Sequence, residues 1–146
     1  MTRLSIKLEG EKALQVALED LAEDIQQAGS NVVLETAAGI EAGVTLRMQQ
    51  GPATGRTYRR GGVVHRASAP GEPPAPSSGG SALLGSIYHE RTGQFSAVVG
   101  SRLAYAAFLE WGTFKMAPRP AWTPEAESAK QPFYADIERA IAGEIR

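Results

Sequence analysis

The chain has 146 residues, of which 42% are hydrophobic and 21% are charged, and its formal net charge at pH 7 is -1. This composition is ordinary for a soluble globular protein, and we expect residues 1–146 to form one domain with a modest core. Because the chain contains no cysteine and only two histidines, the sequence excludes disulfide scaffolds and thiolate metal sites and argues against a histidine-rich metal cage. No apolar run approaches the length of a membrane span and the N-terminus lacks the pattern of a secretory signal, so we expect a protein made in the cytoplasm of its producing cell.

The first fifty residues predict one strand and two helices. Residues 4–8 alternate apolar and polar side chains, which is the period of a half-buried strand. Residues 11–27 carry an apolar stripe opposite an acidic face and predict an amphipathic helix, which the small and polar residues 28–31 are expected to end. A second helix is expected over residues 32–50, paired with the first. The apolar residues of the strand are Leu4, Ile6 and Leu8, and those of the first stripe are Leu14, Leu18, Leu21 and Ile25.

Residues 51–81 differ in composition from the rest of the chain. They are rich in glycine, proline, serine and arginine, and they carry four basic side chains against one acidic one, whereas residues 1–50 carry four against eight. Such a segment buries too little apolar surface to offset its ordering entropy, so we expect a flexible loop in which Val63 and Val64 form a brief strand. Loops of this length in small domains are commonly functional or become ordered against a partner.

The segment that follows the loop predicts a hairpin and a helix. Residues 87–89 are expected to lead into a strand with a turn at residues 91–93, and residues 94–99 are expected to pair back as its antiparallel neighbour, because a short connection that contains glycine is typical of hairpins. Residues 103–111 predict a core helix that Gly112 closes in the left-handed conformation. Residues 114–122 are expected to be irregular. The apolar side chains that the core helix would bury are Tyr105, Phe108 and Leu109.

A last helix is expected from Thr123, which is suited to cap it, with Pro124 in its first turn. Pro132 is expected to interrupt this helix as a kink or a restart. The predicted fold class is therefore α+β, with a small, mostly antiparallel sheet flanked by two N-terminal helices, a short central helix and a C-terminal helix.

The sequence offers few groups for catalysis. Ser68 and Ser86 lack the glycine-flanked turn of a hydrolase nucleophile, and His89 is expected to be a packed or exposed histidine rather than a base. The glycines at positions 51, 55, 61 and 62 are not followed by the Gly-Lys-Ser/Thr of a phosphate-binding loop. We expect no catalytic residues, no metal, no cofactor and no enzymatic activity.

Glu110 stands out because it lies inside an apolar run. It is expected either to be exposed or to pair with Arg119 or Arg102, within the subunit or across an interface, which would offset the cost of burying a charge. The nearby aromatic and apolar residues are expected to belong either to the core or to an anchor for a neighbouring subunit. They are Trp111, Phe114, Met116 and Trp122.

Part of the loop has the composition of a nucleic-acid-binding segment, in which an aromatic side chain is interleaved with bases. The residues concerned are Arg56, Tyr58, Arg59, Arg60, His65 and Arg66. The slightly acidic whole chain and the lack of a helix-turn-helix, zinc or ribonucleoprotein signature argue against this interpretation.

Several motifs, in their order and spacing, resemble those of the small tail-completion, or head-to-tail joining, proteins of long-tailed bacteriophages and prophages. They are Ala69-Pro70-Gly71-Glu72-Pro73-Pro74, Leu83-Leu84-Gly85-Ser86-Ile87, Val99-Gly100-Ser101, Ala104-Tyr105-Ala106, Leu109-Glu110-Trp111-Gly112-Thr113 and Arg119-Pro120. The resemblance covers most of the chain.

The resemblance implies an α+β subunit that acts structurally, as a ring at the neck or upper tail of the virion, after assembly in the cytoplasm of the host bacterium. Its implied partners are other copies of itself and tail-tube, tail-terminator or head-connector proteins, with passing contact with DNA and none with membrane. We expect the loop to reach a tail-tube or connector neighbour and residues 105–119 to form core and adjoining contact surface. The alternative is a non-enzymatic, basic-loop nucleic-acid-binding protein of phage or prophage origin. The candidate interface residues are Arg56, Tyr58, Arg59, Arg60, Arg66, Pro70, Glu72, Tyr105, Glu110, Trp111, Phe114 and Arg119.

Overall fold

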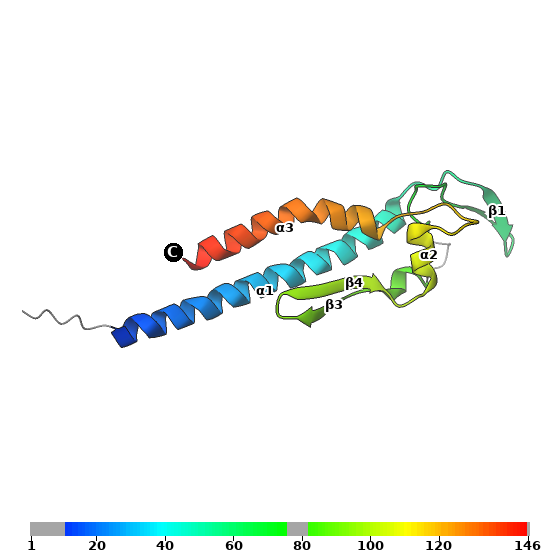
Figure 1. Ribbon diagram of the computed structural model, residues 1–146. Coiled ribbons are helices and arrows are strands. Elements are labelled where there is room, and N and C mark those ends of the chain that lie inside the picture. The colour runs from blue at the N-terminus through cyan, green and yellow to red at the C-terminus, as the bar shows by residue number, and fades with distance from the viewer. Residues whose placement is uncertain (1–10, 76–81, 146) are drawn as a thin grey trace, which may run out of the picture.

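The computed structural model describes residues 11–75 and 82–145. Helix α1 (Glu11–Gln50) runs most of the length of the molecule, and α3 (Trp122–Glu144) lies along it in the opposite direction (Figure 1). A hairpin of β3 (Ile87–Gly93) and β4 (Ser96–Ser101) also packs on α1. The strand predicted at residues 4–8 lies outside the described residues.

The remaining elements gather at the C-terminal end of α1 (Figure 1). They are β1 (Thr57–Arg60), β2 (Val63–Arg66), the 3-10 helix η1 (Leu84–Ser86) and α2 (Tyr105–Trp111). We refer to residues 51–75 and 102–121 as the loop end and to the paired α1 and α3 as the shaft. The predicted α+β class is confirmed, although in the described residues the strands form two separate two-stranded antiparallel sheets instead of one small sheet.

Helix α1 is continuous where the sequence predicted two helices. The expected break is helical because Gly29 and Ser30 are buried under the tip of the β3–β4 hairpin. A Cβ at Gly29 would lie 3.4 Å from the Phe95 ring, and the Arg91 guanidinium donates a hydrogen bond to the Ser30 hydroxyl. A glycine inside a helix costs about 1 kcal/mol relative to alanine, and these contacts offset that cost.

The turn between β3 and β4 lies later in the chain than predicted. β3 continues through residues 91–93 with an irregularity in its register, and the chain reverses at Gln94 and Phe95. The Gln94 side-chain amide donates to Gln26 Oε1 at 3.0 Å, which holds the tip of the hairpin on α1. The position of the turn is therefore set by a contact with α1 that a local turn signal does not contain.

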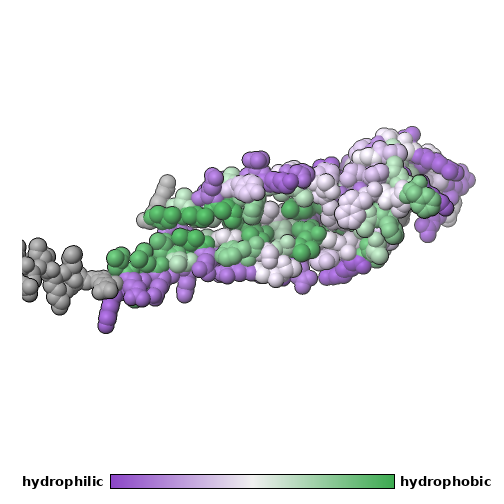
Figure 2. Space-filling view, viewed as in Figure 1, coloured by the Kyte–Doolittle hydropathy of each residue, from purple (hydrophilic) through white to green (hydrophobic). Residues whose placement is uncertain are grey.

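A cluster of six buried hydrophobic residues lies where the shaft meets the loop end. It consists of Val44, Met48, Leu83, Ile87, Ala106 and Ala121. Helix α3 continues through Pro132 without the predicted interruption, and none of its residues is fully buried. Figure 2 shows the hydrophobic side chains of the shaft along the facing sides of α1 and α3. The shaft therefore rests on a line of half-buried contacts, while closer packing is concentrated near the loop end.

Candidate interaction surface

Helix α2 presents its aromatic side chains to solvent. Tyr105, Phe108 and Trp111 follow one another at spacings of three and are all exposed, Trp111 to 73%. The opposite side of the helix is buried through Ala106 and Glu110. The expectation that α2 buries Tyr105 and Phe108 is therefore wrong, because a helix of seven residues has one face to bury and smaller residues occupy it.

A tight turn after α2 adds a fourth aromatic side chain. Gly112 is the C-cap of α2 and has φ 76°, as expected for a closing glycine, but its ψ of -177° is extended instead of left-handed helical. A Cβ there would lie 2.6 Å from the Met116 carbonyl oxygen. Thr113 and Met116 exchange backbone hydrogen bonds of 2.8 and 3.2 Å, which projects Phe114 outward at 95% exposure. We call Tyr105, Phe108, Trp111 and Phe114 the aromatic surface.

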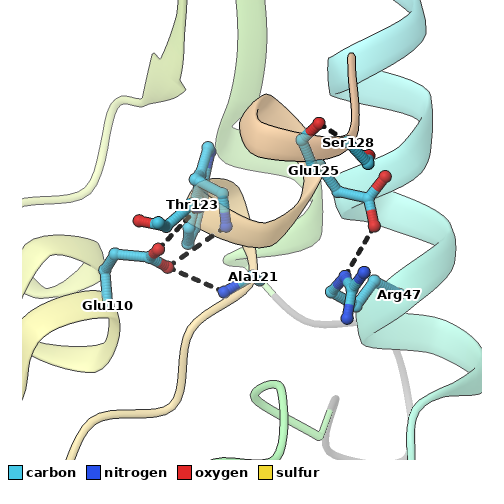
Figure 3. A network of polar contacts seen from close by, with 7 residues as sticks. Arg47, Glu110, Ala121, Thr123, Glu125 and Ser128 are labelled. Carbon is cyan, nitrogen blue, oxygen red and sulfur yellow. Dashed lines mark hydrogen bonds and ion pairs between the residues drawn. The ribbon is translucent and has the colours of Figure 1, made fainter. Parts of the chain in front are cut away.

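Glu110 is a buried helix cap, with 5% of its surface exposed. Its carboxylate accepts hydrogen bonds from the backbone N–H groups of Ala121, Trp122 and Thr123 at 2.7, 3.1 and 2.7 Å (Figure 3). These are donors that the start of α3 leaves without helical partners, and a negative charge at this end also opposes the helix dipole. Glu110 thus performs the capping that the sequence assigned to Thr123.

Both sequence readings of Glu110 are corrected by this geometry. The side chain is not exposed, and the two arginines proposed as partners lie elsewhere. The Arg102 guanidinium is 5.2 Å from the centre of the Tyr88 ring, and Arg119 Nε donates to the Ser68 carbonyl oxygen at 3.2 Å. Backbone amides, instead of a guanidinium, compensate the buried carboxylate.

The first turn of α3 is also tied to α1. Glu125 accepts a hydrogen bond from Arg47 Nε at 2.6 Å, while its carbonyl oxygen accepts one from the Ser128 hydroxyl (Figure 3). A Cβ at Gly43 would lie 2.4 Å from the Glu125 carboxylate, so a larger residue there would move the Glu125 side chain from its present position beside Arg47. Glu110 therefore joins the start of α3 to α2, and Glu125 joins it to α1.

The described part of the predicted flexible loop, residues 51–75, is held by hydrogen bonds, so its flexibility is not confirmed there. The Glu72 carboxylate accepts from the Thr54 hydroxyl, from the Thr54 N–H at 3.0 Å and from the Ala69 N–H at 2.7 Å. These bonds, led by that of the Thr54 hydroxyl, hold the pKa of Glu72 below its ordinary value. The Gly71 N–H donates to the Pro118 carbonyl oxygen at 2.9 Å, and Pro70 is exposed beside it.

The basic part of the loop forms a hairpin of β1 and β2. Gly61 and Gly62 have φ of 57° and 80°, which suits a two-residue turn with both central residues left-handed. The rings of Tyr58 and His65 stack across the strands with centroids 5.4 Å apart. The exposed arginines of this hairpin and its approach are Arg56, Arg59, Arg60 and Arg66.

The structure brings four of the predicted interface residues around one cleft of about 550 Å³ between the hairpin and α2. They are Tyr58, Arg66, Tyr105 and Arg119. Trp111 and Phe114 lie outside it in the aromatic surface, Pro70 and Glu72 belong to the loop's hydrogen-bonded turn, and Glu110 is internal. The sequence analysis did not include Phe108 among the interface residues. Its spacing of three residues from Trp111, which places the two side chains on one side of α2, could have identified it.

Within residues 11–75 and 82–145, no cluster of three histidine or acidic side chains could hold a metal ion. In the same ranges, no helix is long and apolar enough to cross a membrane. Comparison of the chain with protein-family models, with curated proteins and with solved structures yields no match.

Replacing Glu110 by alanine is expected to lower the free energy of unfolding by about 2–4 kcal/mol, because it leaves the buried N–H donors of the α3 start unpaired. Glu127→Gln is the matched control, since Glu127 lies in the first half of α3, the helix that Glu110 caps, and forms an exposed pair with Lys130. The effect of this control substitution on the free energy of unfolding should stay below about 1 kcal/mol. Urea unfolding followed by circular dichroism measures both. Equal effects of the two variants would contradict the capping role.

The Glu72 hydrogen bonds are expected to weaken in acid. Because the pKa of Glu72 in the folded chain lies below its ordinary value of 4.5, its stabilising contribution is complete above that value and is lost as the pH falls through the lowered pKa. Amide exchange at Thr54 and Ala69, measured by NMR after correction for intrinsic rates, should accelerate in that acid range. In Glu72→Gln the two amides should exchange faster already at neutral pH, and a wild-type pH dependence in this variant would rule the explanation out.

Proposed function

We propose that the chain is a structural virion protein of the phage neck or upper tail, which completes the tail and helps to join it to the head through contacts between subunits. The observation that carries the proposal is the aromatic surface. Four large side chains project from a short helix and a tight turn whose backbone is hydrogen-bonded on the inner side. Several exposed aromatic side chains on one short segment are typical of interaction sites in soluble proteins.

The motifs that resemble tail-completion proteins support the proposal by their location. Ala69–Pro74, Leu109–Thr113 and Arg119–Pro120 all lie at the loop end. There Glu72 holds the loop, Glu110 caps α3, and the Arg119 N–H donates to the Leu109 carbonyl oxygen at 2.7 Å. The hydrogen bonds of these motif residues hold the backbone from which the aromatic surface projects. The proposed role of the motifs is therefore structural and involves no reaction.

Energetics favour burial of this surface in an assembly. An aromatic side chain removes roughly 150–250 Å² from water when buried, and apolar area contributes about 25 cal/mol per Å². Because the aromatics sit on a backbone already held by hydrogen bonds, little ordering entropy opposes their docking. The partners in this proposal are other copies of the chain in a ring and a tail-tube, tail-terminator or head-connector subunit.

The rival function, nucleic-acid binding, is favoured by one feature, the projecting β1–β2 hairpin. Arg59 and Arg60 are exposed on it beside Tyr58, which would allow phosphate contacts next to a stacking ring. Tight binding of purified protein to DNA, with a steep loss of affinity as salt rises, would support this rival. A variant with alanine at Arg56, Arg59 and Arg60 would then lose the binding.

The double substitution Trp111→Ser with Phe114→Ser is expected to abolish joining of tails to heads while the protein remains folded. Two anchor side chains worth about 2 kcal/mol each correspond to a loss of roughly a thousandfold in affinity. Infectious titre and electron micrographs of particles measure the effect, and unjoined heads and tails are the expected result.

Tyr134→Ser is the control for this variant, because Tyr134 is an aromatic residue exposed to 60% on α3, away from the aromatic surface. Its particles should be normal. If the double variant also gave joined particles at normal titre, the aromatic surface would not be the joining surface.

A further inference from the structure

An apolar groove runs along the shaft between β4 and α3. Its volume is about 400 Å³, and its floor is formed by α1. The floor residues are Val33, Thr36, Ala37 and Ile40, and the walls include Phe95, Ala97 and Val99 on one side and Ala126, Ala129 and Phe133 on the other. The groove is thus bounded by three different elements and lies apart from the loop end.

One wall of this groove is the open edge of a sheet. In the described residues β4 pairs only with β3, so every second residue of β4 directs its N–H and C=O away from β3. β3 is attached farther around α1, where His89 contacts Glu41 and Arg91 contacts Ser30. The unpaired edge of β4 therefore faces the groove and α3, and such an edge is a template for another strand.

The sequence contains a segment that fits this groove. Leu4, Ile6 and Leu8 alternate with Ser5 and Lys7, so in an extended conformation the three apolar side chains share one face. That face matches the apolar floor, while the serine and lysine would face solvent. The segment is also similar in length to the six residues of β4.

The reach of the chain decides which copy supplies the segment. Val33, the first floor residue, lies 22 residues beyond the start of α1 at Glu11, a distance of about 33 Å. Residues 4–10 span at most about 24 Å when fully extended. Even Leu4 therefore falls short of the groove of its own subunit, and only another copy can place the segment there.

We propose that residues 4–8 of one copy add as a third strand to the free edge of β4 in a second copy, with Leu4, Ile6 and Leu8 in the groove between β4 and α3. A two-stranded sheet is marginally stable alone, and a third strand with an apolar face strengthens it. This inference rests on the proposed function in that copies are expected to assemble, and it names the surface through which they do so.

We call this addition of residues 4–8 to β4 of a second copy the exchange. Disulfide trapping between full-length chains tests it, because the natural chain contains no cysteine. One preparation carries Ser5→Cys, and a second, with a tag of different size, carries Val98→Cys. Val98 is exposed to 46% on β4, and neighbouring strands bring such side chains within disulfide range. After mixing and mild oxidation, a heterodimer band on a non-reducing gel is expected, and this band is intermolecular by construction.

Glu90→Cys replaces Val98→Cys in the matched control, since Glu90 is the residue paired with Val98 on β3 and is one strand farther from the groove. It should give several-fold less heterodimer. Ile6→Asp in the Ser5→Cys chain should remove the band, because it places a charge in the groove, whereas Lys7→Asp should leave it.

Equal yields for Val98→Cys and Glu90→Cys, indifference to Ile6→Asp, or no heterodimer in concentrated protein would each overturn the exchange. These outcomes are separable from the proposed function. A chain that occupies the neck of particles but gives no heterodimer refutes only the exchange, and a chain that gives the heterodimer but is absent from particles refutes only the neck role.

Discussion

The carboxylate of Glu110 joins the end of α2 to the start of α3, and the geometry of the loop end depends on it. A buried charge is unfavourable unless hydrogen bonds compensate it, and here three backbone N–H groups at the positive end of a 23-residue helix do so. With its start held in this way, α3 is directed back along α1, where Arg47 and Glu125 fix its height. The inner face of α2 is used for this contact, which leaves its aromatic residues on the outside.

The two parts of the molecule are stabilised differently. At the loop end, hydrogen bonds from Glu72, Arg119 and Glu110 hold turns and irregular chain in place. Along the shaft, long helices and the β3–β4 hairpin share half-buried apolar contacts, and the edge of β4 that faces away from β3 has no partner strand among the described residues. Both arrangements leave apolar surface that a single subunit does not cover, which is the property that an assembling protein needs.

Local patterns in the sequence predicted the α+β class, the β3–β4 pair, Gly112 as the residue that closes α2 and the irregular chain before α3. They failed where a distant residue overrides a local signal. The Gly29-Ser30 stop is suppressed by Phe95 and Arg91, more than sixty positions away. The unusual position of Glu110 was visible in the sequence, but its partners are backbone amides, which no side-chain motif identifies.

The uninterrupted course of α1 through Gly29 has a mechanical consequence. With 40 residues it is about 60 Å long, and it extends from the loop end to the far end of the shaft (Figure 1). A tilt of about 10° where the loop end is seated moves the opposite tip by roughly 10 Å at this length. The length of the helix therefore converts a small rotation at one end of the molecule into a displacement the size of a helix diameter at the other end.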